Sequence, residues 1–518
     1  MEVIPLPLPR TIMLQGTSSH VGKSLLCTAL CRIFKQEGFR VSPFKAQNMA
    51  LNSYVTADGG EIGRAQGTQA DAAGILATVA MNPVLLKPKQ DLNAQVVVLG
   101  KPLADMSARD YRANFLPQAV GLVEQCIREL QSEYEILVIE GAGSPAEVNL
   151  KDRDIVNMKT AQLADAPVLL VADIDRGGVF AALVGTLELL EPHERQRVAG
   201  FIINKFRGDL DLLRPGLEFL EQRTGKPVLG VIPYLHQHGI EEEDSVALPA
   251  AGKAKAGAEL DIAVIKLPRI SNFTDFDPLT AVPGVDLRFV GPGEDLGRPD
   301  AIILPGTKNT VQDLLFLREE QLDKKMERLV LSGVPVVGIC GGFQMMGKTL
   351  YDPWGTEAGL GNLAGLGWLD METTYLAEKQ THRCHAKMAC AALGWYGITN
   401  QEIKGYEIHT GQVTLGPGIQ PLLEITCRSG QPVSQWDGAV ACQGRILGTH
   451  LHGLFDNAEF LLGWVNFLRR EKELPLLEPS QIPGINRELN YDRLAAVVRQ
   501  HLDMAALGRI MGLEAKEG

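Results

Sequence analysis

Short apolar runs alternate with polar or helix-like stretches through residues 1–240 of the chain. Each run has the length of a buried strand and is bounded by residues that are typical of turns or helix starts. Strands that alternate with helices in this way predict a parallel sheet wrapped by helices. The predicted strands are Thr11–Leu14, Val41–Phe44, Ala94–Leu99, Ile136–Ile139, Val168–Val171 and Gly200–Ile203.

A change of composition marks the end of this first domain. Glu241–Asp244 is an acidic run, and Pro249–Glu259 is rich in alanine, glycine and lysine without an apolar period. We therefore predict a linker over residues 241–260. The alternation then resumes and predicts a second α/β domain over residues 261–457. Its predicted strands are Ile262–Ile265, Leu287–Val290, Ala301–Leu304 and Val334–Ile339.

The last part of the chain, residues 458–518, has the apolar spacing of helices. Apolar positions recur with a helical period in Phe460–Leu468 and again in Leu494–Leu502. We expect a helical tail that packs on a domain.

Composition and charge exclude several classes of protein. The 518 residues carry a formal net charge of −12 and no run of lysine and arginine, which argues against a nucleic-acid partner. Apolar stretches such as Ala166–Ala172 fall far short of the roughly 20 residues that a membrane-spanning helix needs, and the first residues differ from a signal peptide. Eight cysteines without regular spacing are typical of reduced thiols, so we expect a cytoplasmic protein. His382, Cys384, His385 and Cys390 match no established zinc-site spacing.

A phosphate-binding loop follows the first predicted strand. Residues 16–24 read GTSSHVGKS and lead into a good helical opening. Backbone N–H groups of such a loop converge on phosphate oxygens at a helix N-terminus, where Gly16, Thr17 and Gly22 form the loop. Lys23 adds a positive charge, and the Ser24 hydroxyl is a ligand for Mg²⁺. Four residues normally separate the first glycine from Gly-Lys-Ser, which would place it at Thr17, so the loop is altered and resembles that of dethiobiotin synthetase.

Three further residues complete the predicted ATP site. Glu140 ends an apolar strand, at the edge where open α/β sheets bind ligands, and is the second expected Mg²⁺ ligand. A turn carboxylate is the alternative. Lys45 follows the second strand and would neutralise charge during phosphoryl transfer, unless it is simply solvated. Asn204 would present its amide to a purine edge.

A cysteine on a strand-to-helix turn is the sharpest signal in the second domain. Cys340 is flanked by Gly338, Gly341 and Gly342, and small neighbours permit the strained elbow that exposes a nucleophile. The helix N-terminus favours a thiolate, and the Gly341 N–H would stabilise an oxyanion. Gly306, in an earlier glycine turn after a strand, is the second predicted oxyanion-hole residue. A buried structural cysteine is the alternative.

The nucleophile needs a base, and residues 448–455 offer two histidines after a strand-like segment. His450 and His452 fall on the same face of that segment, so the spacing alone does not choose between them. The pattern resembles class I glutaminases, in which a carboxylate stands two residues after the histidine, but Leu454 occupies that position. Either cysteine and histidine act as a dyad, or a distant group such as Asp456 or Glu407 orients the imidazole.

These motifs together resemble the cobyric acid synthase family along the full length of the chain. The Gln47–Ser53 and Asp173–Phe180 segments separate this resemblance from the related a,c-diamide synthases and from dethiobiotin synthetase. The matching segments are Gly16–Ser24, Pro43–Ser53, Gly60–Gln66, Met81–Pro88, Asp173–Phe180, Asn204–Asp209, Gly405–His409 and His452–Phe455.

The resemblance implies a fold and a reaction. It implies an N-terminal P-loop domain like that of dethiobiotin synthetase and a C-terminal class I glutamine amidotransferase-like domain. The implied reaction amidates the b, d, e and g carboxylates of adenosylcobyrinic acid a,c-diamide to give adenosylcobyric acid, with ATP, Mg²⁺ and glutamine. It favours His452 as the base. Since free ammonia is protonated and lost to solvent, we also expect an internal path from Cys340 to the phosphate loop.

The polar segment Asn48–Gln69 would then border the corrinoid and the nucleotide. Its alternative is an ordinary solvated helix and loop. The resemblance implies Asp58 as a further Mg²⁺ ligand. The implied substrate residues are Gln47, Asn48, Asn52, Arg64 and Gln66.

Three other interpretations stay open at the level of sequence. A related amidoligase, such as cobyrinic acid a,c-diamide synthase, would use the same motifs on another carboxylate. A partition-type P-loop nucleotide switch would have no use for Cys340 and His452, whereas a silent glutaminase-like scaffold would fit the missing carboxylate. The corrinoid is the expected small-molecule partner, and a homo-oligomer is compatible with the sequence.

Overall fold

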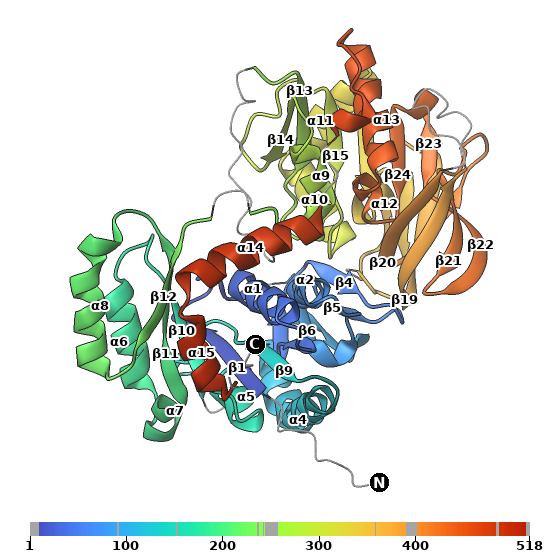
Figure 1. Ribbon diagram of the computed structural model, residues 1–518. Coiled ribbons are helices and arrows are strands. Elements are labelled where there is room, and N and C mark those ends of the chain that lie inside the picture. The colour runs from blue at the N-terminus through green and yellow to red at the C-terminus, as the bar shows by residue number, and fades with distance from the viewer. Residues whose placement is uncertain are drawn as a thin grey trace, which may run out of the picture.

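The structure is a computed structural model that describes residues 10–90, 93–151, 154–235, 238–241, 243, 257–357, 359–389, 401–482 and 486–513. Two α/β domains lie side by side, and a long C-terminal helix crosses back over the first of them (Figure 1). No helix among these described residues combines the length and the apolar character needed to cross a membrane.

A six-stranded parallel sheet forms the centre of the first domain, in the order β12-β11-β10-β1-β9-β2. The chain returns to this sheet through helices, which is why the apolar runs in the sequence are short and widely spaced. Strand β1 lies between β10 and β9, so the loops after β1 and β9 meet at one edge of the sheet. The strands are β1 (Arg10–Gly16), β2 (Val41–Phe44), β9 (Ile136–Glu140), β10 (Val168–Asp173), β11 (Val198–Phe206) and β12 (Val228–Pro233).

Helices cover both faces of this sheet and form two separate hydrophobic cores. One core contains α1 (Lys23–Gln36), the end of α2 (Arg64–Ala73), α14 (Arg487–His501) and α15 (Met504–Met511). The helices that contribute to the opposite core are α4 (Leu116–Glu133), α5 (Met158–Leu163), α6 (Val179–Leu189) and α8 (Leu210–Thr224), and α7 (Pro192–Arg197) leads into β11.

A smaller sheet, in the order β3-β6-β7-β8, is appended to the first domain. The sequence predicted Ala94–Leu99 as a strand of the main parallel sheet, and this placement is wrong. The segment forms β7, which pairs antiparallel with β6 and β8. Short connections on both sides of β7 allow hairpins but leave no room for the crossover that a parallel strand requires. The strands are β3 (Gln47–Met49), β6 (Val84–Gln90), β7 (Asn93–Val98) and β8 (Lys101–Ser107), beside the pair β4 (Ser53–Val55) and β5 (Glu61–Gly63).

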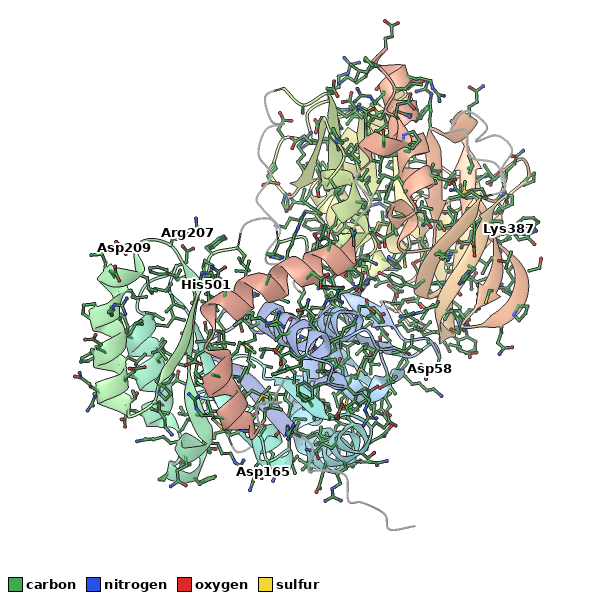
Figure 2. The ribbon with its side chains drawn as sticks, viewed as in Figure 1. Asp58, Asp165, Arg207, Asp209, Lys387 and His501 are labelled. Carbon is green, nitrogen blue, oxygen red and sulfur yellow. The ribbon has the colours of Figure 1, made fainter. Side chains whose placement is uncertain are left out.

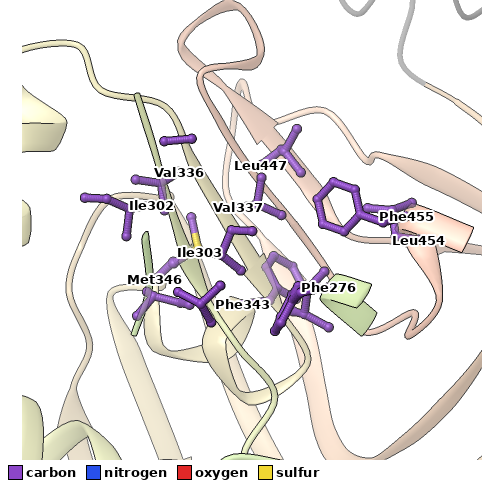
Figure 3. Packing of buried hydrophobic residues seen from close by; sticks show 14 of the residues in the cluster. Phe276, Ile302, Ile303, Val336, Val337, Phe343, Met346, Leu447, Leu454 and Phe455 are labelled. Carbon is purple, nitrogen blue, oxygen red and sulfur yellow. The ribbon is translucent and has the colours of Figure 1, made fainter. Parts of the chain in front are cut away.

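The second domain contains its own sheet, β14-β13-β15-β16-β24-β23, in which only β23 runs antiparallel to its neighbour. Side chains from these strands pack against Phe276, Phe343 and Phe455 in one large core (Figure 3). The strands are β13 (Leu260–Ile265), β14 (Val285–Val290), β15 (Ala301–Leu304), β16 (Val336–Ile339), β23 (Ala439–Ala441) and β24 (Ile446–Thr449). The helices are α9 (Asp277–Thr280), α10 (Thr310–Glu319), α11 (Leu322–Leu331), α12 (Gly341–Met345) and α13 (Ala458–Glu471).

A largely antiparallel layer, in which β17 pairs parallel with β19, was not predicted by the sequence analysis and covers one side of the second domain. Its strands follow the order β18-β17-β19-β21-β22, and the long β20 pairs with β19. These strands are exposed on one face and therefore lack the continuous apolar runs of the central sheets. They are β17 (Thr349–Asp352), β18 (Gly361–Ala364), β19 (Met371–Met388), β20 (Glu402–Leu415), β21 (Leu423–Arg428) and β22 (Gln431–Asp437).

The helices of the predicted tail divide between the two domains. Helix α13 is part of the second core, whereas α14 and α15 return to the first domain. Arg32 on α1 pairs with Glu488 and Asp492 on α14, at 2.7 Å each.

A buried ion-pair network joins the domains. The Glu61 carboxylate on β5 lies 2.5 Å from the ammonium of Lys87 and 2.5 Å from that of Lys379, which belongs to β19 of the second domain. Burial raises the pKa of Glu61, but the two lysines lower it by more, so the carboxylate stays charged. Removal of one member would leave an uncompensated buried charge, so the network favours one arrangement of the domains.

Candidate functional site

The altered phosphate loop spans the turn between β1 and α1. Gly16 ends the strand and Lys23 begins the helix, and Gly22 has a φ of 96°, a conformation that favours glycine. The Lys23 ammonium donates to the backbone carbonyls of Ser18, at 3.2 Å, and Gly143, at 3.4 Å. Burial lowers the pKa of Lys23, although Glu140 partly offsets this effect. The lysine therefore lies across the loop where an anion would be bound.

Ser24, Lys45 and Glu140 come together at the carboxyl edge of the sheet. Glu140 accepts hydrogen bonds at 2.8 Å from both the Ser24 hydroxyl and the Lys45 ammonium. Its other oxygen accepts from Gln69 at 2.6 Å and from Gln66 at 3.3 Å. Burial lowers the pKa of Lys45, but the carboxylates raise it by more, so the lysine keeps its proton. A hydroxyl and a carboxylate beside phosphate-binding amides are the oxygen donors that Mg²⁺ prefers.

A carboxylate from the segment between the domains lies in the same place. Glu243 accepts from the Ser24 hydroxyl at 2.9 Å, from Lys45 at 3.2 Å and from the Asn48 amide at 2.6 Å. Burial raises the pKa of Glu243, but Lys45 and the surrounding donors lower it by more. The sequence analysis treated this segment only as a linker, because an acidic run by itself carries no sign of its contacts.

Asn204 lies beside the phosphate loop, whereas Asp58 lies away from it. The Asn204 amide donates one N–H to the Val21 carbonyl at 2.8 Å, and its contact with a purine edge stays a prediction. Asp58 is exposed and accepts from Thr56 in the turn before β5. Figure 2 shows Asp58 at the edge of the first domain, beneath the long strands of the second. The structure does not bring it to Ser24 and Glu140.

The predicted substrate residues divide into three groups. Asn48 and Asn52 contact Glu243, and Gln66 bonds both Asn48, at 2.9 Å, and the carboxylate of the ATP site. Arg64 lies at the domain boundary, 5.1 Å from the centre of the Tyr406 ring. Gln47 alone lines the cavity beside the phosphate loop.

That cavity has a volume of about 520 Å³ and adjoins the loop that follows β9. Its wall is largely apolar, with Met49, Val96, Met106 and Tyr111 from the small appended sheet and the segment after it. Gly143, which accepts from the phosphate-loop lysine, lines it on the other side. A ligand in this cavity would therefore reach the phosphates directly.

The predicted nucleophile lies at a strained elbow. Cys340 has a φ of 49° between β16 and α12, although it is not a glycine. A methyl group on Gly342 would lie 2.1 Å from the carbonyl oxygen of Leu304, so the elbow packs against the backbone of the neighbouring strand. The Gly341 position faces Thr307, in the turn that also contains Gly306. The two predicted oxyanion-hole glycines therefore lie in adjacent loops.

A carboxylate that the sequence analysis missed completes this site. Nδ1 of His452 lies 2.6 Å from the Asp275 carboxylate, in the 3-10 turn η5 (Phe273–Phe276). Burial lowers the pKa of His452, but the charge and hydrogen bond of Asp275, together with a hydrogen bond to Cys340, raise it to about 10. Tyr406 stacks on the imidazole at a centroid distance of 5.1 Å. Cys340, His452 and Asp275 thus have the relationship of nucleophile, base and orienting group.

The sequence-based candidates for the orienting group are wrong. Asp456 pairs with Arg487 at 3.2 Å, and Glu407 pairs with Arg428 at 2.6 Å. His450 is also separate, since its Nδ1 lies 2.8 Å from Asp437. Asp275 follows a strand of the second sheet, which was the one local signal available. Its 177-residue separation from the histidine hid the contact.

The two sites approach each other at the domain boundary. The Asn272 amide nitrogen lies 3.4 Å from Nε2 of His452, and its oxygen accepts from the Ser53 backbone at 2.8 Å. The preceding residue, Asn52, donates to the Glu243 carbonyl at 3.2 Å. One short segment of the first domain therefore contacts the surroundings of both sites.

Comparison with known proteins agrees with this division. Residues 12–244 match the model of the CobQ/CobB/MinD/ParA nucleotide binding domain, and residues 261–460 match that of the CobB/CobQ-like glutamine amidotransferase domain. The cobyric acid synthase of Desulforamulus reducens is 72% identical over 98% of this chain and 99% of its own length. That of Pelotomaculum thermopropionicum is 54% identical over 98% of this chain and 97% of its own length.

The fold and the two matched domains define a glutamine-dependent ligase, with an ATP-binding domain and a glutamine amidotransferase domain in one polypeptide. The predicted fold class is confirmed. The chain belongs to the cobyric acid synthase family, as its motifs indicated.

Proposed function

We propose that this chain amidates the b, d, e and g carboxylates of adenosylcobyrinic acid a,c-diamide to give adenosylcobyric acid, a reaction of cobalamin biosynthesis. The observation that carries the proposal is the direct approach of the two sites through Asn272 and Ser53. One site is suited to activate a carboxylate and the other to release ammonia. Their proximity favours a reaction in which ammonia never leaves the protein.

Glutamine hydrolysis begins at Cys340. Its thiolate attacks the carboxamide carbon, and N–H groups near Gly306 and Gly341 stabilise the oxyanion. His452, held by Asp275, gives its proton to the leaving nitrogen, so that ammonia departs and a thioester remains. The neutral imidazole then takes a proton from water, which attacks the thioester and releases glutamate.

Carboxylate activation takes place at the phosphate loop. A substrate carboxylate attacks the γ-phosphorus of ATP, which yields an acyl phosphate and ADP. Lys23 and Lys45 balance the negative charge on the phosphates. Ammonia then attacks the acyl carbon, phosphate leaves, and a proton is lost to give the amide. Ser24 and Glu140 would hold Mg²⁺, which neutralises phosphate charge when it is bound.

One side of the corrinoid would occupy the cavity of about 520 Å³ beside Gly143, which is smaller than the whole substrate. Its apolar wall suits the face of a macrocycle, and Arg112 and Lys151 line it among the polar groups. These cations suit the peripheral carboxylates of the substrate. Since no described contact brings Asp58 to this place, it has no role in the proposal.

The test is amidation of adenosylcobyrinic acid a,c-diamide by wild type and Cys340→Ala, each with glutamine or with ammonium. We expect the variant to lose glutamine-driven turnover, measured as glutamate release and ATP consumption, and to keep ammonium-driven turnover. Preference for cobyrinic acid would instead identify an a,c-diamide synthase. Absence of glutamine hydrolysis in the wild type would overturn the proposal and leave a nucleotide switch or a silent scaffold.

We further propose a cytoplasmic location, which the free thiols of the described cysteines support. A homo-oligomer stays a prediction that light scattering tests.

A further inference from the structure

A small cavity beside Cys340 is lined by residues of both domains. Its volume is about 140 Å³, the scale of one amino acid. Lys308 and Lys379 reach it from the second domain, while Lys87 and Lys89 reach it from β6 of the first. The cavity therefore exists in this form only while the domains are in contact.

Three of the four lysines already have a carboxylate partner. Lys87 and Lys379 share the Glu61 carboxylate, and Lys89 pairs with Asp105 at 2.7 Å. The fourth lysine of the cavity is Lys308.

The Lys308 ammonium makes no hydrogen bond or ion pair with the part of the chain that the structure describes, although its backbone N–H donates to Arg269. Burial lowers the pKa of Lys308 to about 7, and the positive charges of Lys379 and Lys87 act in the same direction, with Glu357 opposing. Lys308 is partly buried and faces a cavity without a partner for its charge among the described residues, so an anionic ligand group would stabilise it there.

Glutamine supplies such a group if its carboxamide is placed at Cys340. The reacting end must lie at the elbow, so the α-amino and α-carboxylate groups must lie in the rest of the cavity. A charge-assisted hydrogen bond from a lysine is the strong way to hold a carboxylate there. Glu357, which also lines the cavity, accepts from the Thr310 backbone N–H at 2.7 Å through one oxygen, and its other oxygen would accept from the α-ammonium.

We propose that Lys308 binds the α-carboxylate of glutamine in a pocket that strand β6 of the ATP-binding domain completes. This inference rests on the proposed function and deepens it. It makes Lys308 a specificity residue: the pocket selects an amino acid rather than any carboxamide. Because Lys89 also donates to the Thr356 carbonyl at 2.8 Å, recognition of glutamine depends on the contact between domains.

The experiment measures calorimetric binding of L-glutamine and of 4-aminobutanamide, which is glutamine without its α-carboxylate. The full-length Cys340→Ala protein serves as the background, so that no glutamine is consumed. We expect it to bind glutamine on the order of tenfold to hundredfold more tightly than the analogue, the range of a hydrogen bond to a charged group. Adding Lys308→Met should remove most of this preference and leave the affinity for the analogue unchanged.

Two matched variants separate binding from folding. Lys308→Arg keeps the charge and should retain part of the preference, whereas Lys348→Met removes an exposed lysine that pairs with Asp370 and should change nothing. Ammonium-driven amidation by Lys308→Met with Cys340 intact should equal that of the wild type. Equal loss of both ligands, or an unchanged preference in Lys308→Met, would overturn the inference.

The pH dependence gives a second readout. Bound carboxylate favours the protonated form of Lys308, so glutamine affinity should fall as the pH rises past about 7. Lys379, Lys87, Lys89 and Glu357 are the charged groups around it, and all remain in Lys308→Arg, which should lose this dependence because arginine stays protonated. If the wild type neither binds nor hydrolyses glutamine, the proposed function itself fails.

Discussion

Asp275 and His452 lie 177 residues apart in the chain, and their side chains meet at 2.6 Å in the second domain. The carboxylate contacts Nδ1 and leaves Nε2 on the side of Cys340. It therefore fixes both the orientation and the tautomer of the imidazole. A second bond, from the Gly453 backbone to Asp275 at 3.0 Å, holds the carboxylate in place.

Replacement of Asp275 should therefore leave the His452 imidazole without the group that orients it. We expect Asp275→Asn to lower glutamine-driven turnover on the order of 10²–10⁴-fold, the usual contribution of a positioned general base. Ammonium-driven amidation should stay near the wild-type rate, since it bypasses this site. Asp456→Asn is the matched control, because Asp456 pairs with Arg487 instead. Equal effects of the two variants on glutaminase kinetics would contradict the assignment.

The same contact predicts how stability depends on pH. The folded-state pKa of His452 is about 10, above the roughly 6.5 of an unfolded histidine. Its contribution is fully present below about pH 6.5 and is lost as the pH rises through about 10. Urea unfolding of wild type and Asp275→Asn between pH 6.5 and 10 measures this. The stability difference between them should shrink as the pH rises, and a constant difference would exclude the linkage.

The elbow at Cys340 predicts a strong effect of one added methyl group. In Gly342→Ala the new group would lie 2.1 Å from the Leu304 carbonyl oxygen, and backbone on both sides cannot yield cheaply. We expect destabilisation of about 1–3 kcal/mol from overpacking, together with loss of glutaminase activity. Gly121→Ala, on the exposed side of α4 with nothing within 4 Å, should instead stabilise by about 0.5–1 kcal/mol. Thermal unfolding of both variants is the measurement.

Glu140 should be needed whatever the source of nitrogen. Its carboxylate contacts both Ser24 and Lys45 at 2.8 Å, at the place where Mg²⁺ would be bound. In Glu140→Gln we expect both glutamine-driven and ammonium-driven amidation to fall, and the Mg²⁺ concentration for half-maximal rate to rise more than about tenfold. Cys340→Ala, by contrast, should lose only the glutamine-driven reaction. If Glu140→Gln also lost only the glutamine-driven reaction, the assignment of Glu140 to the ATP site would be wrong.

The approach of the sites predicts retention of ammonia. With ¹⁵N-labelled external ammonium and unlabelled glutamine, the amide product should carry mainly unlabelled nitrogen. Mass spectrometry of the product measures the ratio. In Asn272→Ala, which removes the side chain that contacts both His452 and Ser53, the labelled fraction should rise. If ammonia from glutamine exchanged fully with external ammonium in the wild type, the proposed internal path would be wrong.

The sequence by itself determined the features that depend on neighbouring residues. The phosphate loop and the Cys340 elbow each consist of a strand, a glycine turn and a helix start, so local sterics and hydrogen bonding specify them. The apolar runs likewise predicted most strands of both central sheets, although not β12 or β23, because a strand buried on both faces needs a continuous apolar run.

Tertiary structure alone decided the contacts between distant segments. Asp275 reaches His452, Glu243 reaches Ser24, and Lys87 reaches the cavity at Cys340 only because the sheets bring those elements together. The sequence offered Asp456 and Glu407 in place of Asp275, since proximity along the chain says little about proximity across a fold. The half-exposed antiparallel strands were missed for a related reason: their pairing, rather than their composition, makes them strands.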